Sequence, residues 1–252
     1  MTQKSSKNRL DTLLVDRGLI SSREKARALI MEGKVSVDGM RVDKPGKEIS
    51  NLAQLEVKEP LEYVSRGGIK LAAALDEFGI DPVGLTALDA GASTGGFTDC
   101  LLQRGTQRII AVDVGYGQFH WKLRNDPRVR LIERTNFRYL EGSTLNESVD
   151  AAVADLSFIS LKLVLAKFAE ILPKGSWFVP LVKPQFEVGR ADVGKHGVVR
   201  DPDVIGAAIE SVIAVAIETG FTVLNQIESP IKGPKGNREF LLHLLLTTKM
   251  NF

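Results

Sequence analysis

The segment LDAGASTGGFTDCLL, residues 88–102, constrains the fold more than any other part of the chain. Its apolar residues lead into a glycine-rich turn and then into a helical pattern, which is the strand–turn–helix unit of α/β folds. With this unit included, strand-like runs occur at 86–91, 108–114, 129–133, 149–156, 177–182, 221–228 and 240–246, and helix-like runs at 68–78, 97–104, 118–125, 161–172 and 204–219. This alternation predicts an α/β domain with a seven-stranded, mostly parallel sheet covered by helices on both faces.

The glycine-rich turn GASTGG, residues 91–96, indicates which ligands fit. It lacks the Gly-Lys-Ser/Thr ending of a P-loop, so no lysine is present to reach a triphosphate. Ser93 stands where a dinucleotide-binding loop has the glycine that lets the backbone approach a pyrophosphate. A ligand without phosphates, such as S-adenosylmethionine, fits better, and Asp113 at the end of the next strand suits its ribose hydroxyls. The alternative is an ordinary strand-to-helix turn with Asp113 as a helix cap.

The N-terminal part of the chain has a different pattern. Residues 8–20 and 21–34 each have the apolar spacing of a short helix, and Ser21 and Glu24 have the spacing of a capping box. The run VSVDGMRV, residues 35–42, predicts a hairpin around a two-residue type I′ turn. We therefore expect a small α+β unit here.

Composition and segment ends limit the class of protein. The run Lys58-Glu59-Pro60 is typical of a linker, so we expect one domain at 1–60 and another at 61–252. Cys100 is the single cysteine, which excludes an intrachain disulfide and a cysteine metal cluster. The polar N-terminus has no signal-peptide core, and no run of 18 apolar residues is present. These features favour a cytoplasmic protein without a membrane segment or a metal, whose oligomeric state stays open.

The net charge of +2 is small, so a nucleic-acid site requires local clustering of basic residues. Such clustering occurs in the first 60 residues, which also contain no tyrosine or tryptophan for base stacking. This composition favours recognition of folded RNA by shape and charge. The alternative is an ordinary solvated face, because acidic residues are interspersed. The candidate RNA contacts are Arg9, Arg17, Arg23, Lys25, Arg27, Lys34 and Arg41.

Four scattered polar residues are candidates for chemistry. Lys70 begins the helix before the first large strand, whereas Asp155, Lys183 and Glu239 lie where an apolar strand meets a loop. Open α/β sheets bind their ligands at such edges. A partly buried lysine loses its proton more readily than an exposed one and can serve as a general base, with carboxylates holding it in place. Asp155 could pair with Lys183, and Glu239 with Lys70. Taken singly, each is more simply an ordinary solvated charge at a strand end.

Two long loops, residues 184–201 and 229–239, are rich in glycine and charge. Compact α/β domains usually have shorter connections. We expect these loops to be ordered lids over a substrate.

The order Lys70, DAGASTGGF, Asp155, Lys183 and Glu239 resembles the Lys-Asp-Lys-Glu tetrad of FtsJ-like ribose 2′-O-methyltransferases, and the N-terminal unit resembles the S4-like RNA-binding fold. Together with SRGGIKL, AVADLSFISL, LVKPQFE, HGVVRD and KGNREFL, these features make the chain similar to the TlyA (hemolysin A) family from about Arg9 to Thr247.

This resemblance implies a class I (Rossmann-like) methyltransferase domain, S-adenosylmethionine as donor, and the ribose 2′-oxygen of a cytidine in ribosomal RNA as acceptor. It implies that Lys183 is the base or orients the oxygen, that Asp155 polarises Lys183, and that Lys70 and Glu239 orient the nucleotide. By motif position, it implies cofactor contacts at Asp89, Gly91, Ser93, Gly95, Gly96, Asp113 and Asn136.

Other functions stay open at this point. A non-catalytic ribosome-assembly factor could keep the fold and the RNA-binding unit without turnover. A haemolysin, which the family name suggests, would need a signal sequence or a membrane-inserting segment. The modified nucleotide, the ribosomal subunit and the choice between naked RNA and an assembled particle are not determined by the sequence.

Overall fold

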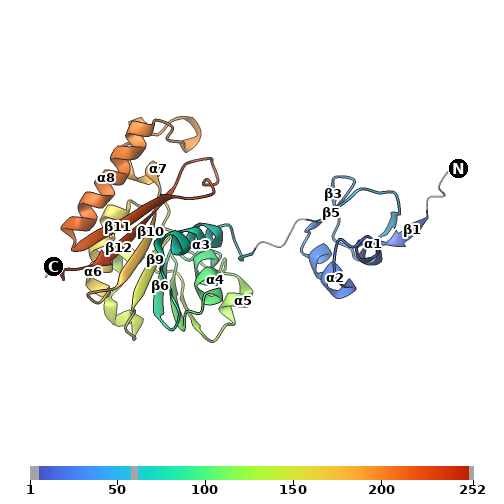
Figure 1. The fold of residues 1–252 in the computed structure, drawn as a ribbon, viewed down its shortest axis with the longest axis horizontal. Helices are drawn as coiled ribbons and strands as arrows, with labels where there is room; N and C mark the ends of the chain where they lie inside the picture. The colour runs from blue at the N-terminus through green and yellow to red at the C-terminus, as the bar shows by residue number, and fades with distance from the viewer. Residues whose placement is uncertain (1–5, 58–61, 250–252) are drawn as a thin grey trace. The chain divides into compact units, whose positions relative to one another are not determined.

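The computed structural model describes residues 6–57 and 62–249. The chain divides into two compact units, Met1–Leu61 and Glu62–Phe252, which we call the small unit and the large unit (Figure 1). The expected linker at Lys58-Glu59-Pro60 lies outside the described residues.

The small unit is an α+β structure with its own core. Its elements are β1 (Lys7–Arg9), α1 (Leu10–Asp16), α2 (Arg23–Met31), β2 (Val35–Val37), β3 (Met40–Arg41), β4 (Glu48–Ser50) and β5 (Leu55–Val57). Strand β1 pairs with β4, and β3, β2 and β5 form a three-stranded antiparallel sheet. Leu10, Leu14, Ile30 and Val35 are fully buried between the two helices and these strands.

Local structure in the small unit differs from the sequence-based expectation at two helix starts. Residues Lys7–Arg9 form strand β1, so the first helix begins at Leu10. The cap of α2 is Ser22, whose hydroxyl accepts from the Lys25 amide at 3.3 Å, so the capping box expected from Ser21 does not form. The hairpin is as predicted, with positive φ at Asp38 and at the residue after it.

The large unit alternates strands and helices. Its elements are α3 (Gly67–Phe78), β6 (Thr86–Ala90), α4 (Gly96–Gln103), β7 (Arg108–Val112), α5 (Trp121–Arg124), β8 (Val129–Ile132), η1 (Phe137–Tyr139), η2 (Gly142–Leu145), β9 (Ala151–Ala154), η3 (Leu161–Leu163), α6 (Leu165–Ile171), β10 (Trp177–Val182), α7 (Pro184–Glu187), η4 (Arg190–Asp192), η5 (Lys195–Gly197), α8 (Pro202–Glu218), β11 (Phe221–Glu228) and β12 (Phe240–Leu246).

The seven strands form one sheet in the order β11-β12-β10-β9-β6-β7-β8. Strands β8, β7, β6, β9 and β10 are parallel, and β12 is antiparallel to both β10 and β11. The predicted seven-stranded, mostly parallel sheet is therefore confirmed.

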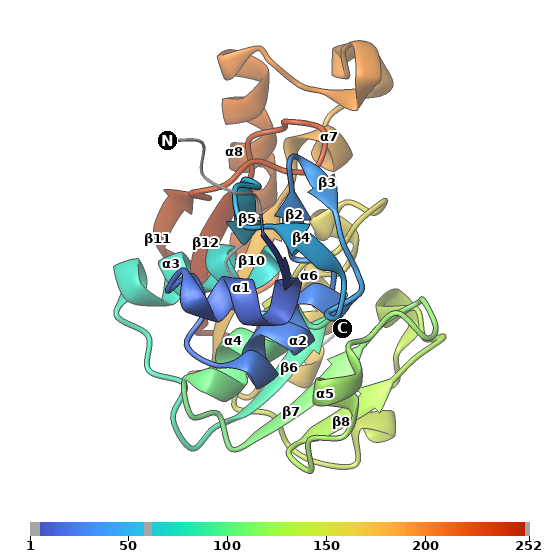
Figure 2. The same ribbon diagram turned by 90° about the vertical axis from the view of Figure 1, so that its right-hand side faces the viewer.

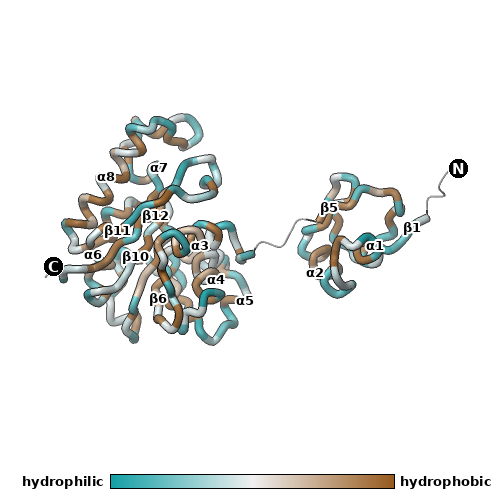
Figure 3. The backbone as a smooth tube through the Cα atoms, viewed as in Figure 1, coloured by the Kyte–Doolittle hydropathy of each residue, from teal (hydrophilic) through white to brown (hydrophobic). Residues whose placement is uncertain are grey.

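Successive residues of each strand point to opposite faces of the sheet, and helices cover both faces. Leu88 and Ile110 pack with α6 and α8 on one face, and Ala87 and Ile109 pack with α3, α4 and α5 on the other (Figures 1 and 2). Figure 3 shows the apolar stretches of β6 and α8 that supply this core. Among the described residues, no helix is long and apolar enough to cross a membrane.

Candidate active site

The sheet topology brings three of the four candidate residues to one edge. Asp155 directly follows β9 and Lys183 directly follows β10, and these two strands are parallel neighbours. Glu239 directly precedes β12, and Phe240 of that strand pairs with Val182 of the antiparallel neighbour β10. The start of β12 therefore lies beside the carboxyl end of β10, which is the ligand-binding edge of such sheets.

Lys183 and Asp155 form the first of two close ion pairs. The Lys183 Nζ lies 2.6 Å from Asp155 Oδ1, and only 8% of the Lys183 surface is exposed. Asp155 Oδ1 is buried and has no aligned hydrogen bond, so this contact is electrostatic. The aligned hydrogen bond of the Lys183 amine is donated to the Ser157 hydroxyl at 2.7 Å. The sequence pattern gave no indication of a role for Ser157.

Lys70 and Glu239 form the second ion pair. The Lys70 Nζ donates to Glu239 Oε2 at 2.5 Å, and both side chains are more than nine-tenths buried. The loop before β12 passes close over this carboxylate, because a Cβ built on Gly233 would lie 2.4 Å from Glu239 Oε1. The pairing expected for the four residues is thus present in the structure.

A cavity of about 660 Å³ opens beside Asp155, which also lines it. Four of the predicted cofactor residues line this cavity, namely Gly91, Ser93, Asp113 and Asn136. Its size is within the range of small-molecule and cofactor sites. The glycine turn packs closely against the end of β9. Gly91 has φ +82°, and a Cβ at this position would lie 2.7 Å from the Asp155 carbonyl oxygen.

The Asp113 carboxylate is largely engaged by the protein itself. Its Oδ2 accepts from the Ser93 amide at 2.7 Å, and its Oδ1 accepts from the Gly115 amide at 2.6 Å and from Gln118 Nε2 at 3.1 Å. A carboxylate has about four acceptor positions, so about one remains for a ligand hydroxyl. Ser93, whose amide donates to this carboxylate, has the left-handed φ of +49°.

The other three predicted cofactor residues are not among the residues that line this cavity in the described chain. Asp89 is fully buried and accepts from the Thr98 hydroxyl at 2.6 Å. Burial raises the pKa of Asp89 to about 7, although the Thr98 hydrogen bond opposes that shift. Gly95 precedes α4, and Gly96 begins it and lies against Ser65, which a Cβ at that position would approach to 2.2 Å.

Two exposed aromatic residues, Phe158 and Tyr116, lie in the loops that follow β9 and β7. Phe158 lines the cavity, is 91% exposed and has φ +65°, an unusual conformation for a bulky residue. The Arg134 guanidinium lies 4.1 Å from the centre of the exposed Tyr116 ring. Sequence reasoning missed these residues, because an aromatic side chain next to a strand is more often part of the core.

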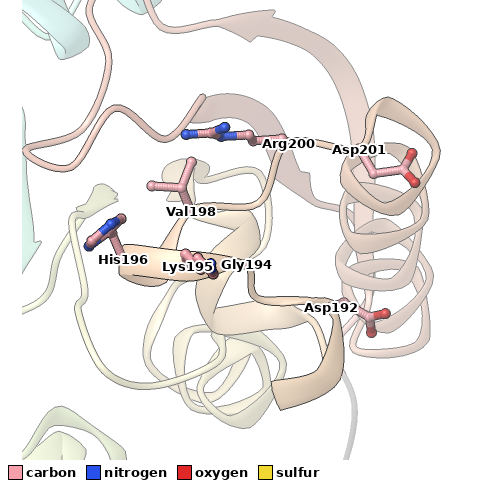
Figure 4. A pocket seen from close by; sticks show the side chains of 7 residues that line it. All are labelled: Asp192, Gly194, Lys195, His196, Val198, Arg200 and Asp201. Carbon is pink, nitrogen blue, oxygen red and sulfur yellow. The ribbon is translucent and has the colours of Figure 1, made fainter.

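The two long loops are joined through one buried side chain. Asn237 Nδ2 donates to the Gly197 carbonyl at 2.8 Å, and Asn237 Oδ1 accepts from the Val199 amide at 3.0 Å. The loop 184–201 also borders a second cavity of about 520 Å³, lined by charged residues that include Lys195 and Arg200 (Figure 4). Asn237 thus links the two loops, whereas their expected role as lids stays a prediction.

In the small unit, several candidate RNA contacts already have protein partners. Arg9 and Arg23 both bind the buried Asp11 carboxylate, at 2.9 and 3.2 Å, and the pKa of Asp11 falls well below its usual range because of the Arg9 hydrogen bond. Arg17 donates to the carbonyls of Asn51 and Ala53. These contacts hold the guanidinium groups in place, and sequence reasoning missed Asp11.

The other candidates differ in exposure. Lys25, Arg27 and Arg41 are exposed, and Lys34 is half-buried. Arg41 lies over Gly33, where a Cβ would come within 1.9 Å of its Nε.

Comparison with known proteins identifies both units. The model of the FtsJ-like methyltransferase family matches residues 63–245, and the model of the S4 domain matches residues 8–51. The chain is 50% identical over 242 residues to "Putative rRNA methyltransferase YqxC" of Bacillus subtilis, covering 95% of this chain and 86% of the relative. It is 48% identical over 242 residues to "16S/23S rRNA (cytidine-2'-O)-methyltransferase TlyA" of Mycobacterium tuberculosis, covering 95% and 90%.

A solved structure gives the same result. "Putative hemolysin from Streptococcus thermophilus" matches with a TM-score of 0.75 and 46% identity, covering 96% of this chain and 90% of that chain. The seven-stranded sheet and the family match together confirm the predicted class I methyltransferase fold. The chain therefore belongs to the FtsJ-like methyltransferase family, among the TlyA and hemolysin A proteins that carry an N-terminal S4 domain.

Proposed function

We propose that this protein transfers a methyl group from S-adenosylmethionine to the ribose 2′-oxygen of a cytidine in ribosomal RNA. The observation that carries the proposal is the Lys183–Asp155 pair, which lies beside a cavity of cofactor size at the carboxyl edge of the sheet. The relative from Mycobacterium tuberculosis bears the name of this activity. A ribosomal substrate implies a cytoplasmic location.

The lining of the cavity fits the proposed cofactor. The backbone of Gly91 and Ser93, the remaining acceptor position of Asp113 and the amide of Asn136 together supply polar groups for a nucleoside and an amino-acid moiety. The apolar side chains of Phe137 and other lining residues supply contact area for a base. S-Adenosylmethionine, when bound, supplies a methyl group on a positively charged sulfur, which is a strong electrophile.

The residues of the chain would then act on the acceptor. A ribose hydroxyl is a poor nucleophile at neutral pH, so its proton must be removed as the new bond forms. We assign Lys183 as the group that accepts this proton, with Asp155 holding the amine at the cavity. The buried pair of Lys70 and Glu239 would shape and hold the neighbouring edge where the nucleotide binds. No step of this scheme requires a metal ion.

The small unit would bind the RNA. Its S4 match and its exposed basic side chains support contacts with the phosphate backbone, and Asp11 would hold Arg9 and Arg23 in a fixed arrangement for this purpose. Two residues on α2, Lys25 and Arg27, offer a direct test. Replacing both with glutamine should reduce the slope of log affinity against log salt concentration by about 2.

The experiment that tests the proposal is transfer of a tritiated methyl group from S-adenosylmethionine to ribosomal subunits that lack the modification. Wild type is compared with Lys183→Ala, and with Lys174→Ala as a matched control. Lys174 is exposed and precedes β10 at the end opposite to Lys183. We expect label at one alkali-resistant linkage, its loss in Lys183→Ala and its retention in Lys174→Ala.

The non-catalytic assembly factor predicts a different outcome. Wild type and Lys183→Ala would both bind the subunit, and neither would label its RNA. Label in the base or in protein would refute the choice of acceptor.

A further inference from the structure

The Ser157 hydroxyl holds an unusual position for an exposed side chain. Ser157 lies two residues after Asp155 and lines the cavity, yet its Oγ accepts the aligned hydrogen bond of the nearly buried Lys183 amine at 2.7 Å. It is thus a second partner of that amine, and on the proposed function it would stand next to the reacting groups.

The number of donors on a lysine amine explains why a second partner matters. A neutral amine has two N–H groups and one lone pair, and only the lone pair can accept a proton from a ribose hydroxyl. Asp155 Oδ1 and Ser157 Oγ are two acceptors within 2.6 and 2.7 Å of Lys183 Nζ. The Ser157 hydroxyl fixes the direction of one N–H through its aligned hydrogen bond, and the Asp155 carboxylate attracts the other N–H electrostatically, which leaves one direction for the lone pair.

We propose that Ser157 is a positioning residue that, together with Asp155, orients the Lys183 lone pair toward the acceptor hydroxyl. The inference rests on the proposed function and adds to it a residue outside the Lys-Asp-Lys-Glu set. In the step itself, the ribose O2′ forms a bond to the methyl carbon while its proton passes to Lys183 Nζ. The carbon–sulfur bond breaks, and its electron pair stays on the sulfur.

The fold holds the turn that carries Ser157 at both ends. At one end, Asp155 and Ser157 contact Lys183. At the other end, Glu187 accepts from the Ser160 hydroxyl at 2.5 Å and from the Leu161 amide at 2.8 Å. Since Glu187 closes the short helix α7 directly after Lys183, both ends of the turn are tied to the same short segment, Lys183–Glu187.

The backbone of this turn is also unusual. Phe158, the residue after Ser157, has φ +65° and is 91% exposed, so burial of its ring does not explain the conformation. A bulky residue adopts this region at a cost of about 1 kcal/mol or more. Such a conformation persists where neighbouring contacts determine it, and here those contacts include the Ser157–Lys183 hydrogen bond.

The test uses the full-length chain with Ser157→Ala and Ser157→Thr, and Ser143→Ala as the control. Ser143 is an exposed serine in η2 and, within the described residues, does not line the cavity. Single-turnover methyl transfer to unmodified ribosomal subunits is measured, together with the dissociation constants for S-adenosylmethionine and for the subunit.

We expect Ser157→Ala to slow single-turnover transfer by about 10- to 100-fold, as misorientation of a reacting group does. Both dissociation constants should stay within about threefold of wild type, because neither ligand is held mainly by this hydroxyl. Ser157→Thr keeps the hydroxyl and should recover most of the rate, and Ser143→Ala should match wild type.

Two outcomes would overturn the inference. Equal single-turnover rates for wild type and Ser157→Ala would show that Asp155 alone orients Lys183. A Ser157→Ala variant whose loss appears only as weaker binding would make Ser157 a binding residue. A wild type that transfers no methyl group to a ribose would instead refute the proposed function, so the two failures are distinguishable.

Discussion

Replacing Glu239 with glutamine should destabilise the large unit strongly, because it leaves the Lys70 ammonium without a counterion. The Lys70 and Glu239 side chains are 7% and 1% exposed, and their charged atoms are 2.5 Å apart, so solvent screens the pair little. Removing one partner of such a buried pair costs about 3–5 kcal/mol. Glutamine still offers an oxygen to the amine, so we expect the loss of unfolding free energy in Glu239→Gln to lie near the lower end of this range, at about 3 kcal/mol.

The assay is urea unfolding of the full chain, followed by tryptophan fluorescence. Both tryptophans, Trp121 and Trp177, belong to the large unit, so the signal reports that unit alone. A double variant with Lys70→Met and Glu239→Gln should lose less stability than the sum of the two single variants, because no uncompensated charge remains.

The control for this cycle is Arg238→Gln. Arg238 pairs with Glu228 at 2.6 Å, but both side chains are about 40% exposed and screened by solvent, so its loss should cost far less than the loss of Glu239. A Glu239→Gln variant as stable as Arg238→Gln would refute the reasoning. So would a double variant that loses as much as the two single variants added together.

Three further predictions concern the glycine turn and its surroundings. The pKa of Asp89 is about 7 in the folded chain against 3.8 as the reference, so the unfolding free energy should fall as pH rises from about 4 to 7. Urea unfolding at pH 5 and 8 covers about two pH units of this range, so the fall should be at most about 3 kcal/mol, and Asp89→Asn should abolish it. Burial raises the pKa of Cys100 to about 12, so iodoacetamide should label this thiol only as the chain unfolds. Mass spectrometry measures the labelling, and rapid labelling of the native protein would contradict the prediction. Gly91→Ala adds a Cβ 2.7 Å from the Asp155 carbonyl oxygen at φ +82°, so the turn beside the cavity must shift. Calorimetry should then show that S-adenosylmethionine binds at least about tenfold more weakly, and an unchanged affinity would count against this cavity as the cofactor site.

The fold and the pairing within the site could be predicted because both depend on regular topology. Parallel strands end at the same edge, and an antiparallel strand begins there, so Asp155, Lys183 and Glu239 converge although they are distant in sequence. Strand β1 could not be predicted in this way. Its three residues, Lys7–Arg9, are exposed and polar and are defined only by pairing with Glu48–Ser50, some 40 residues away.

The details of the cavity depend on contacts that have no sequence period. The sequence predicts that Asp113 faces a ribose, and the structure shows most of its acceptor positions occupied by the amides of Ser93 and Gly115 and by the Gln118 side chain. These local contacts within two loops leave no periodic pattern in the sequence. A ligand hydroxyl must therefore use the remaining position or displace one of these donors. Gln118→Ala distinguishes these two cases, because it removes one donor from Asp113. The variant should bind the cofactor more tightly only if the ligand hydroxyl displaces the Gln118 amide.

The same argument separates Ser157 from the four residues that the sequence indicated. Lys183 and Asp155 lie where they do because two strands end there, so any sequence that preserves the strands preserves their positions. Ser157 contacts Lys183 from an irregular turn in which the next residue, Phe158, has a positive φ and Glu187 holds the far end. The strands therefore determine which groups are present at the edge, whereas this turn determines the direction in which the lysine amine points.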